Sequence, residues 1–147
     1  MFTTYQDFVN HRDATANDFH SKNSFWAFSK KDFVEGMRGL GLGETDYKLI
    51  VKIDNCGFML KDKVDEYKSM YKSFDQLLSD SINGDKSGDG FIYSMFNAEL
   101  SNYEYCITGD PLPSIYALNL TMDDIKRNKV LLRGYNKAIK NQLKSVG

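Results

Sequence analysis

The side chains with the clearest potential for chemistry lie in a polar loop between two predicted helices. Its sequence, Asp85-Lys86-Ser87-Gly88-Asp89-Gly90-Phe91-Ile92, matches the first eight positions of an EF-hand calcium loop, with oxygen ligands at the first, third and fifth positions. The twelfth position should be a bidentate Glu, but Phe96 stands there. The remaining candidate ligands, Asp85, Ser87 and Asp89, supply too few oxygens for Ca²⁺. The sequence therefore favours a solvated loop, in which Asp89 caps the next helix, over a calcium site at residues 85–96.

Two further residues, Cys106 and Glu104, could supply a nucleophile and an acid close together in the chain. A thiol nucleophile needs a neighbouring base, and the two histidines, His11 and His20, lie far from Cys106 in sequence. The histidines also lack the Cys pair or the HExxH spacing of a zinc site. A cysteine that packs as a small hydrophobe is the favoured interpretation. With no Walker A sequence present, the sequence favours a protein without catalytic activity, and we expect no cofactor.

Another group of side chains is suited to binding a small ligand or a partner. Aromatic rings stack on nucleobases, and arginine pairs bidentately with phosphate. The candidate binding residues are Trp26, Arg38, Asn102, Glu104, Tyr105 and Arg133. A pocket that sequesters a nucleotide signal would need a concave, partly polar cavity near Asn102. The favoured interpretation of that segment is a helix end, with Asn102 bonded to nearby backbone and with Tyr103 and Tyr105 in the core.

The last predicted helix is rich in basic residues. They are Lys126, Arg127, Lys129, Arg133, Lys137, Lys140 and Lys144, partly balanced by Asp123 and Asp124. Over the whole chain, 19 basic and 20 acidic residues give a net charge of −1, so the overall field attracts neither nucleic acid nor an anionic membrane. Only this local patch could contact nucleic acid. A solvated helix face is the favoured interpretation, because basic residues are also expected near a helix C-terminus.

Hydrophobic periodicity and turn residues predict the elements that position these side chains. We expect, in chain order, a short helix from Tyr5 to about His11, a strand over 24–28, a helix opened by Ser29 with Asp32, a hairpin over 48–60, a helix over 62–81, a helix from Phe91, a short helix over 114–118 and a final helix opened by Thr121 with Asp124. No internal repeat or linker interrupts this order. The prediction is one α+β domain over residues 1–147, with a small antiparallel sheet and about five helices.

Composition supports a folded chain in a reducing compartment. Apolar residues make up 41% and aromatic residues 14% of the 147 positions, which is too much large apolar surface for a disordered chain. The two cysteines, Cys56 and Cys106, lie far apart and form no CxxC unit. No leader sequence is recognised, and no apolar run approaches the roughly 20 residues that span a bilayer. A cytoplasmic protein with no membrane role is therefore expected.

Ordered short motifs over residues 24–121 carry a resemblance to a known group of proteins. The motifs are Phe25-Trp26-Ala27-Phe28-Ser29 with Phe33, Glu35-Gly36 and Leu40-Gly41-Leu42, Gly57-Phe58 with Lys61, and Asn102-Tyr103-Glu104-Tyr105-Cys106-Ile107-Thr108 with Asp110, Ala117 and Leu120-Thr121. They resemble small uncharacterised proteins encoded by phages and prophages of gut bacteria, which usually carry His where Tyr103 stands. That family has no assigned activity, so the resemblance implies an origin but no site residues. The stretch between the two helices in such proteins is an ordinary acidic linker, which also disfavours calcium.

The sequence-based hypothesis is a non-enzymatic, phage-type accessory protein that binds a host component. The absence of a catalytic set, the small size and the many Tyr and Phe able to anchor an interface all favour a host protein as partner. The resemblance adds inhibition of a bacterial defence system, such as a CRISPR nuclease, as the expected role in the host cytoplasm. The alternatives are the nucleotide-sequestering pocket and, ranked lower, an enzyme that uses Cys106 or Glu104. The oligomeric state is left open.

Overall fold

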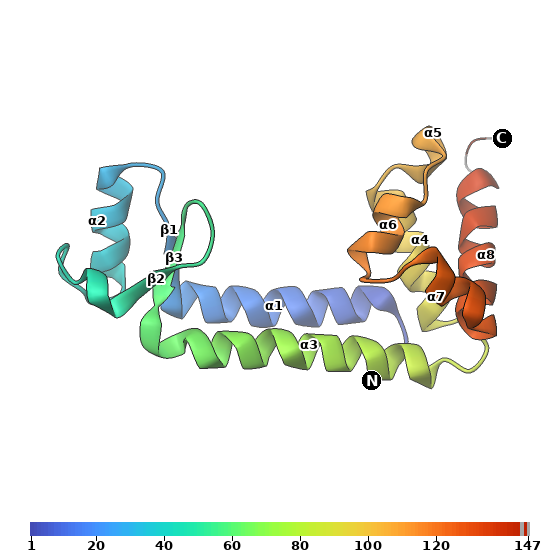
Figure 1. The fold of residues 1–147 in the computed structure, drawn as a ribbon, viewed down its shortest axis with the longest axis horizontal. Helices are drawn as coiled ribbons and strands as arrows, with labels where there is room; N and C mark the ends of the chain where they lie inside the picture. The colour runs from blue at the N-terminus through green and yellow to red at the C-terminus, as the bar shows by residue number, and fades with distance from the viewer. Residues whose placement is uncertain (145, 147) are drawn as a thin grey trace. The chain divides into compact units, whose positions relative to one another are not determined.

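The computed structural model describes residues 1–144 and residue 146 of the chain. The chain divides into two compact units: unit 1 comprises Met1–Asn10 with Gln76–Gly147, and unit 2 comprises His11–Asp75. Two long helices, α1 (Tyr5–Asn23) and α3 (Val64–Gly84), each continue from one unit into the other (Figure 1). The prediction of one domain over the whole chain stays a prediction.

The α+β class with a small antiparallel sheet is confirmed. The described residues form one three-stranded sheet and eight α-helices, of which three contain only four to six residues. The remaining elements are β1 (Ser24–Trp26), α2 (Lys30–Gly39), η1 (Tyr47–Leu49), β2 (Ile50–Lys52), β3 (Gly57–Leu60), η2 (Lys61–Lys63), α4 (Phe91–Asn102), α5 (Tyr105–Thr108), α6 (Leu112–Ala117), α7 (Met122–Arg127) and α8 (Lys129–Lys144). None of the helices within the described residues is both long and apolar enough to cross a membrane.

The first helix is much longer than expected. It was predicted to end near His11, but α1 continues to Asn23. Residues 12–22 contain neither Gly nor Pro, so nothing in the backbone stops the helix there. An i,i+4 ion pair, with the Lys22 ammonium 3.1 Å from the Asp18 carboxylate, also favours the last turns. The extension was missed because this stretch has few apolar residues at helical spacing.

The sheet lies in unit 2, with β3 in the centre and β1 and β2 on either side, both antiparallel to it. The register pairs Phe25 with Phe58, and their rings stack with centroids 5.3 Å apart. Phe33 of α2 meets the edge of Phe58 at 5.3 Å, so α2 packs on this face of the sheet. A Cβ on Gly36 would overlap the Phe25 ring, and glycine therefore permits the close approach of α2 to β1.

In unit 2, the predicted N-cap of α2 and the predicted hairpin are confirmed. The Ser29 hydroxyl accepts a hydrogen bond of 3.1 Å from the Asp32 backbone N–H and caps α2. In the predicted β2–β3 hairpin, the Asp54 carboxylate accepts from the Cys56 N–H at 2.8 Å and from the Trp26 indole N–H at 3.2 Å. The Cys56 hydrogen bond, followed by that from Trp26, holds the pKa of Asp54 below its usual value.

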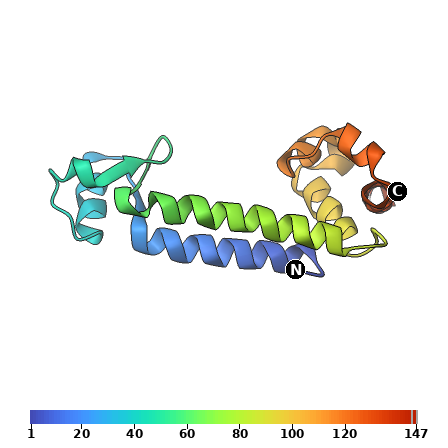
Figure 2. The same ribbon diagram turned by 60° about the horizontal axis from the view of Figure 1, so that its bottom comes forward.

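The unit 2 portions of α1 and α3 lie side by side and contact each other through rings (Figure 1, Figure 2). His11 meets the edge of Phe74 at 6.3 Å, and Phe19 packs against Tyr67 at 6.2 Å. His20 contacts Tyr67 as well, at 5.8 Å. Each of these distances joins ring centroids. Aromatic packing thus holds the two helices together in this unit.

The core of unit 1 is formed by α4 and α8, which lie side by side (Figure 1). The fully buried side chains of α4 are Phe91, Ile92, Met95, Phe96 and Leu100. From α8, Tyr135 meets the edge of the Phe96 ring at 5.5 Å. A Cβ on Gly134 would lie 2.5 Å from Ile92 Cγ2 and 2.6 Å from the Gly88 carbonyl oxygen, so only glycine allows this approach of α8.

The predicted final helix consists of two helices. The capping box of Thr121 and Asp124 is confirmed, but it opens α7, which ends at Arg127. Asn128 adopts an extended conformation, with φ −118° and ψ 110°. Its side-chain oxygen then accepts from the Val130 and Leu131 N–H groups, at 3.0 and 3.1 Å, and caps α8.

Candidate functional site

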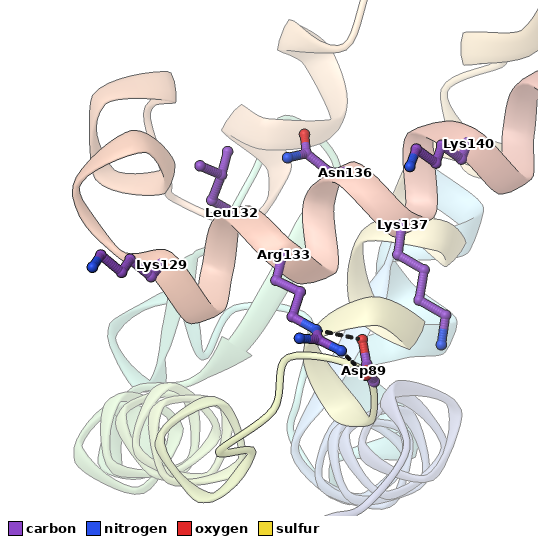
Figure 3. Close-up of a pocket in the computed structure, with 7 residues that line it drawn as sticks. All are labelled: Asp89, Lys129, Leu132, Arg133, Asn136, Lys137 and Lys140. Atoms are coloured by element: carbon purple, nitrogen blue, oxygen red, sulfur yellow. Dashed lines mark hydrogen bonds and ion pairs between the residues drawn. The ribbon is translucent and has the colours of Figure 1, made fainter.

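A groove with a volume of about 610 Å³ runs along α8 (Figure 3). We call it the α8 groove and define it by its lining residues, which are Asp89, Lys129, Leu132, Arg133, Asn136, Lys137 and Lys140. The six residues from α8 recur at steps of three, one, three, one and three, and these steps select a single face of a helix. The opposite face of α8 carries the buried side chains Leu131, Tyr135 and Ala138. The groove therefore lies on the side of α8 that does not pack on the core.

The α8 groove is strongly basic. Seven basic residues lie between positions 126 and 144, and no acidic residue follows Asp124 in the sequence. With about 100° of rotation per residue, the five cations of α8 itself fall in an arc of roughly 80°. We call this set the basic stripe; its members are Lys129, Arg133, Lys137, Lys140 and Lys144. The stripe concentrates positive charge on one face of a chain whose net charge is −1.

Two members of the basic stripe are held in place by α4 and the loop before it. The Arg133 guanidinium makes a bidentate pair with the Asp89 carboxylate, with Nε 3.2 Å from Oδ1 and Nη2 3.0 Å from Oδ2 (Figure 3). This hydrogen bond lowers the pKa of Asp89 and raises that of Arg133. The Lys137 ammonium lies 4.5 Å from the centroid of the Tyr93 ring. Both side chains are thus positioned along the groove.

The other lysines of the stripe are free to contact a partner. Lys129, Lys140 and Lys144 are exposed. Within residues 1–144 and 146, the Arg133–Asp89 pair is the only ion pair made by a member of the stripe. Exposed, unpaired ammonium groups cost little to pair with an incoming anion, because their own partners need not be displaced.

Asp85, and not Asp89, organises the loop that resembles an EF-hand. One carboxylate oxygen of Asp85 accepts from the Gly88 N–H at 3.0 Å, and the other accepts from the Gly90 and Ile92 N–H groups at 3.1 and 3.0 Å. Burial raises the pKa of Asp85, but the hydrogen bonds from Ile92 and Gly88 outweigh it and hold the pKa below its usual value. The prediction that Asp89 caps α4 is wrong: the N-cap position is Gly90, and Asp89 pairs with Arg133.

The candidate calcium ligands are therefore engaged within the chain. Asp85 and Asp89 satisfy their carboxylates as described above, and the Ser87 hydroxyl donates to Asp85 at 3.2 Å and accepts from the Asp89 N–H at 3.0 Å. Within the described residues, no group of three or more His, Cys, Asp and Glu side chains could hold a metal ion. A cation at this loop would have to compete with these hydrogen bonds for the same oxygens.

The six residues proposed to bind a ligand or partner fall in both units. Trp26 and Arg38 belong to unit 2, where Trp26 donates to Asp54 and Arg38 is exposed near the end of α2. Asn102, Glu104, Tyr105 and Arg133 belong to unit 1. Of the six, Arg133 lines the α8 groove. The nucleotide-sequestering pocket stays a prediction.

The segment around Asn102 differs from its favoured interpretation in two details. The Asn102 amide donates to the Glu99 carboxylate at 3.3 Å, not to backbone. Tyr103 is 44% exposed, so its predicted place in the core is wrong, while Tyr105 is half-buried. Glu104 has a φ of 56°, a left-handed conformation that lets α4 end and α5 begin within two residues.

The side chains considered for nucleophilic catalysis lie in ordinary packing and hydrogen-bonding environments. Cys106 is half-buried in α5 of unit 1. In unit 2, His20 Nδ1 and the Ser24 hydroxyl form a hydrogen bond of 2.9 Å. Desolvation lowers the pKa of His20 from its ordinary value of 6.5. These contacts do not support the enzyme hypothesis.

Sequence reasoning found the basic residues of α8 but treated them as a solvated face. The signal that it passed over is the recurrence of Lys129, Arg133 and Lys137 at steps of four, continued by Lys140, with no acid between them. The groove itself could not be predicted from the sequence, because it depends on where α8 lies against Asp89, more than 40 residues away in the chain.

The chain belongs to a protein family described as "Family of unknown function (DUF7659)", which matches residues 7–141. This match extends beyond both ends of residues 24–121, the segment that contains the short motifs noted in the sequence. No curated protein and no solved structure matches the chain.

Proposed function

We propose that the protein is a non-enzymatic binding protein that contacts an acidic surface of a host protein through the α8 groove. The observation that carries this proposal is the concentration of four cations in the α8 groove, three of them exposed lysines without an ionic partner among the described residues. A face of this kind steers an acidic partner into place and sets its orientation. The resemblance to phage-encoded proteins supports a finer proposal, which is inhibition of a bacterial defence system such as a CRISPR nuclease in the host cytoplasm.

The α8 groove would form one part of a larger contact. Exposed ion pairs each contribute little, and a stable protein interface usually buries about 800 Å² on each partner. Exposed apolar side chains of unit 1 are available to extend the contact, among them Ile107 at 79% and Tyr116 at 59% exposure. In this arrangement the lysines determine the association rate and the choice of partner, and apolar burial adds affinity.

Capture from bacterial lysate with a matched pair of variants tests the proposal. The groove variant carries Lys129→Glu and Lys140→Glu, and the control carries Lys68→Glu and Lys72→Glu on exposed positions of α3. Both variants change the net charge by the same amount, and all four lysines are exposed. We expect the wild-type and control proteins to retain the same specific host protein and the groove variant to lose it. Equal retention by the groove variant would show that α8 is not the contact face.

The anti-defence role has its own test. Bacteria that carry an active defence system are infected with a sensitive phage while they express the wild-type, groove-variant or control protein. We expect plaques to recover with the wild-type and control proteins but not with the groove variant. Unchanged plaque numbers across a panel of defence systems would refute inhibition of defence and leave host-protein binding to be judged from the capture experiment.

A further inference from the structure

We infer that the occupant of the α8 groove is an acidic amphipathic helix of the partner, laid lengthwise along α8; this inference rests on the proposed function. The groove is elongated in the required direction. Its lining residues run from Lys129 to Lys140, which at 1.5 Å per residue corresponds to about 16 Å along the axis of α8. All but one of them come from α8, so the concavity follows a single helix. A straight, rod-like ligand fits a surface of this form.

The cations are spaced as an acidic helix requires. Lys129, Arg133 and Lys137 follow one another at four-residue intervals, or about 6 Å along the axis. Carboxylates at i and i+8 of a second helix recur at the spacing of Lys129 and Lys137, so two acids can meet these lysines without distortion of either helix, while Arg133 between them is paired with Asp89. Along one strand of a nucleic-acid duplex, charges recur every 3.4 Å or so, which does not match this interval.

A seam of three apolar residues, interrupted by Asn136, runs beside the basic stripe. Leu132, Asn136, Ile139 and Leu143 recur at steps of four, three and four, the spacing of core positions in a coiled coil. Leu132 and Ile139 are half-buried, and Leu143 is 53% exposed. Lysine stems, which are apolar, extend this surface into the groove. A partner helix with Leu or Ile along its own seam and acids on one flank would cover both the seam and the stripe.

Two other occupants fit the charges less well. A second copy of α8 would bring the same five cations and no acid, so like charges would meet across the interface. Nucleic-acid-binding domains usually have a pI above about 9, whereas this chain has a pI near 6.1. Unit 1 itself holds nine acidic residues against eight basic ones. The groove lining also contains no aromatic side chain on which a base could stack.

Fluorescence anisotropy with three probes tests the inference on the full chain. The first probe is a labelled peptide with Glu at every fourth position and Leu at heptad spacing; the second is a scrambled peptide of the same composition; the third is a labelled DNA duplex. The protein is used as wild type, as the neutral groove variant Lys129→Ala with Lys140→Ala, and as the control Lys68→Ala with Lys72→Ala. Circular dichroism confirms that each variant is folded before it is titrated.

We expect the patterned peptide to bind the wild-type and control proteins about ten times more tightly than the groove variant, and about ten times more tightly than the scrambled peptide binds. Equal binding of the patterned and scrambled peptides would overturn the helical occupant. Tighter binding of the duplex, with affinity falling steeply between about 50 and 200 mM salt, would assign the groove to nucleic acid instead. If the two peptides bind equally, loss of lysate capture with Lys129→Glu and Lys140→Glu would still support the proposed function, so failure of the inference and failure of the function are distinguishable.

Discussion

The Asp85 carboxylate should contribute more to stability than any other acidic side chain of the loop before α4. In the variant Asp85→Ala, three backbone N–H groups lose their acceptor. The Gly90 N–H is exposed, so water replaces the carboxylate there at little cost. The Gly88 and Ile92 N–H groups lie in part-buried hydrogen bonds. At about 1 kcal/mol for each of these two, the free energy of unfolding should fall by about 2 kcal/mol, which is also the upper end for loss of a helix cap.

A thermal melt followed by circular dichroism measures this effect. A domain near 150 residues loses about 2–4 °C of Tm for each kcal/mol, so Asp85→Ala should melt about 4–8 °C lower than the wild type. The matched control is Asp89→Ala, which removes only the exposed pair with Arg133 and should shift the Tm much less. If Asp89→Ala lowered the Tm as much as Asp85→Ala or more, Asp89 would be the cap after all, and the assignment of Asp85 as the organising residue would be refuted.

Three further outcomes are expected. Millimolar Ca²⁺ should leave the Tm unchanged, because the carboxylates of the loop are used within the chain; a rise of several degrees that disappears in Asp85→Ala would contradict this. Gly134→Ala should lower the free energy of unfolding, measured in urea, by about 1–3 kcal/mol, because the added Cβ would overlap Ile92. This loss should exceed the gain of about 1 kcal/mol that alanine brings to a helix, and a stabilised variant would contradict the close approach of α8 to α4. Because burial lowers the pKa of His20 in the folded state, the unfolded state binds the proton more readily. The free energy of unfolding should therefore decline as the pH falls below 6.5 and through the lower pKa of the folded state. His20→Gln should weaken that decline between pH 7.5 and 5.5, and an unchanged pH dependence in the variant would contradict this role of His20.

The features that sequence alone predicted are those decided by neighbouring residues. The Ser29 cap, the box of Thr121 with Asp124 and the hairpin around Asn55-Cys56-Gly57 each depend on side chains within a few positions of the backbone that they satisfy. The helix α3 was predicted from its apolar residues at steps of three and four, which is likewise a local property. For these elements the physical cause and the sequence pattern lie in the same segment, so the pattern was sufficient.

The features that only the tertiary structure decided involve residues far apart in the chain. The sequence predicted Asp89 as the cap of α4, but Arg133, 44 residues after Asp89, pairs with the Asp89 carboxylate. The basic residues of α8 likewise follow from the sequence, but the groove exists because Gly88 and Gly134 let α8 approach the loop before α4. Such contacts depend on where packed helices bring their side chains, and no local rule of propensity or capping contains that information.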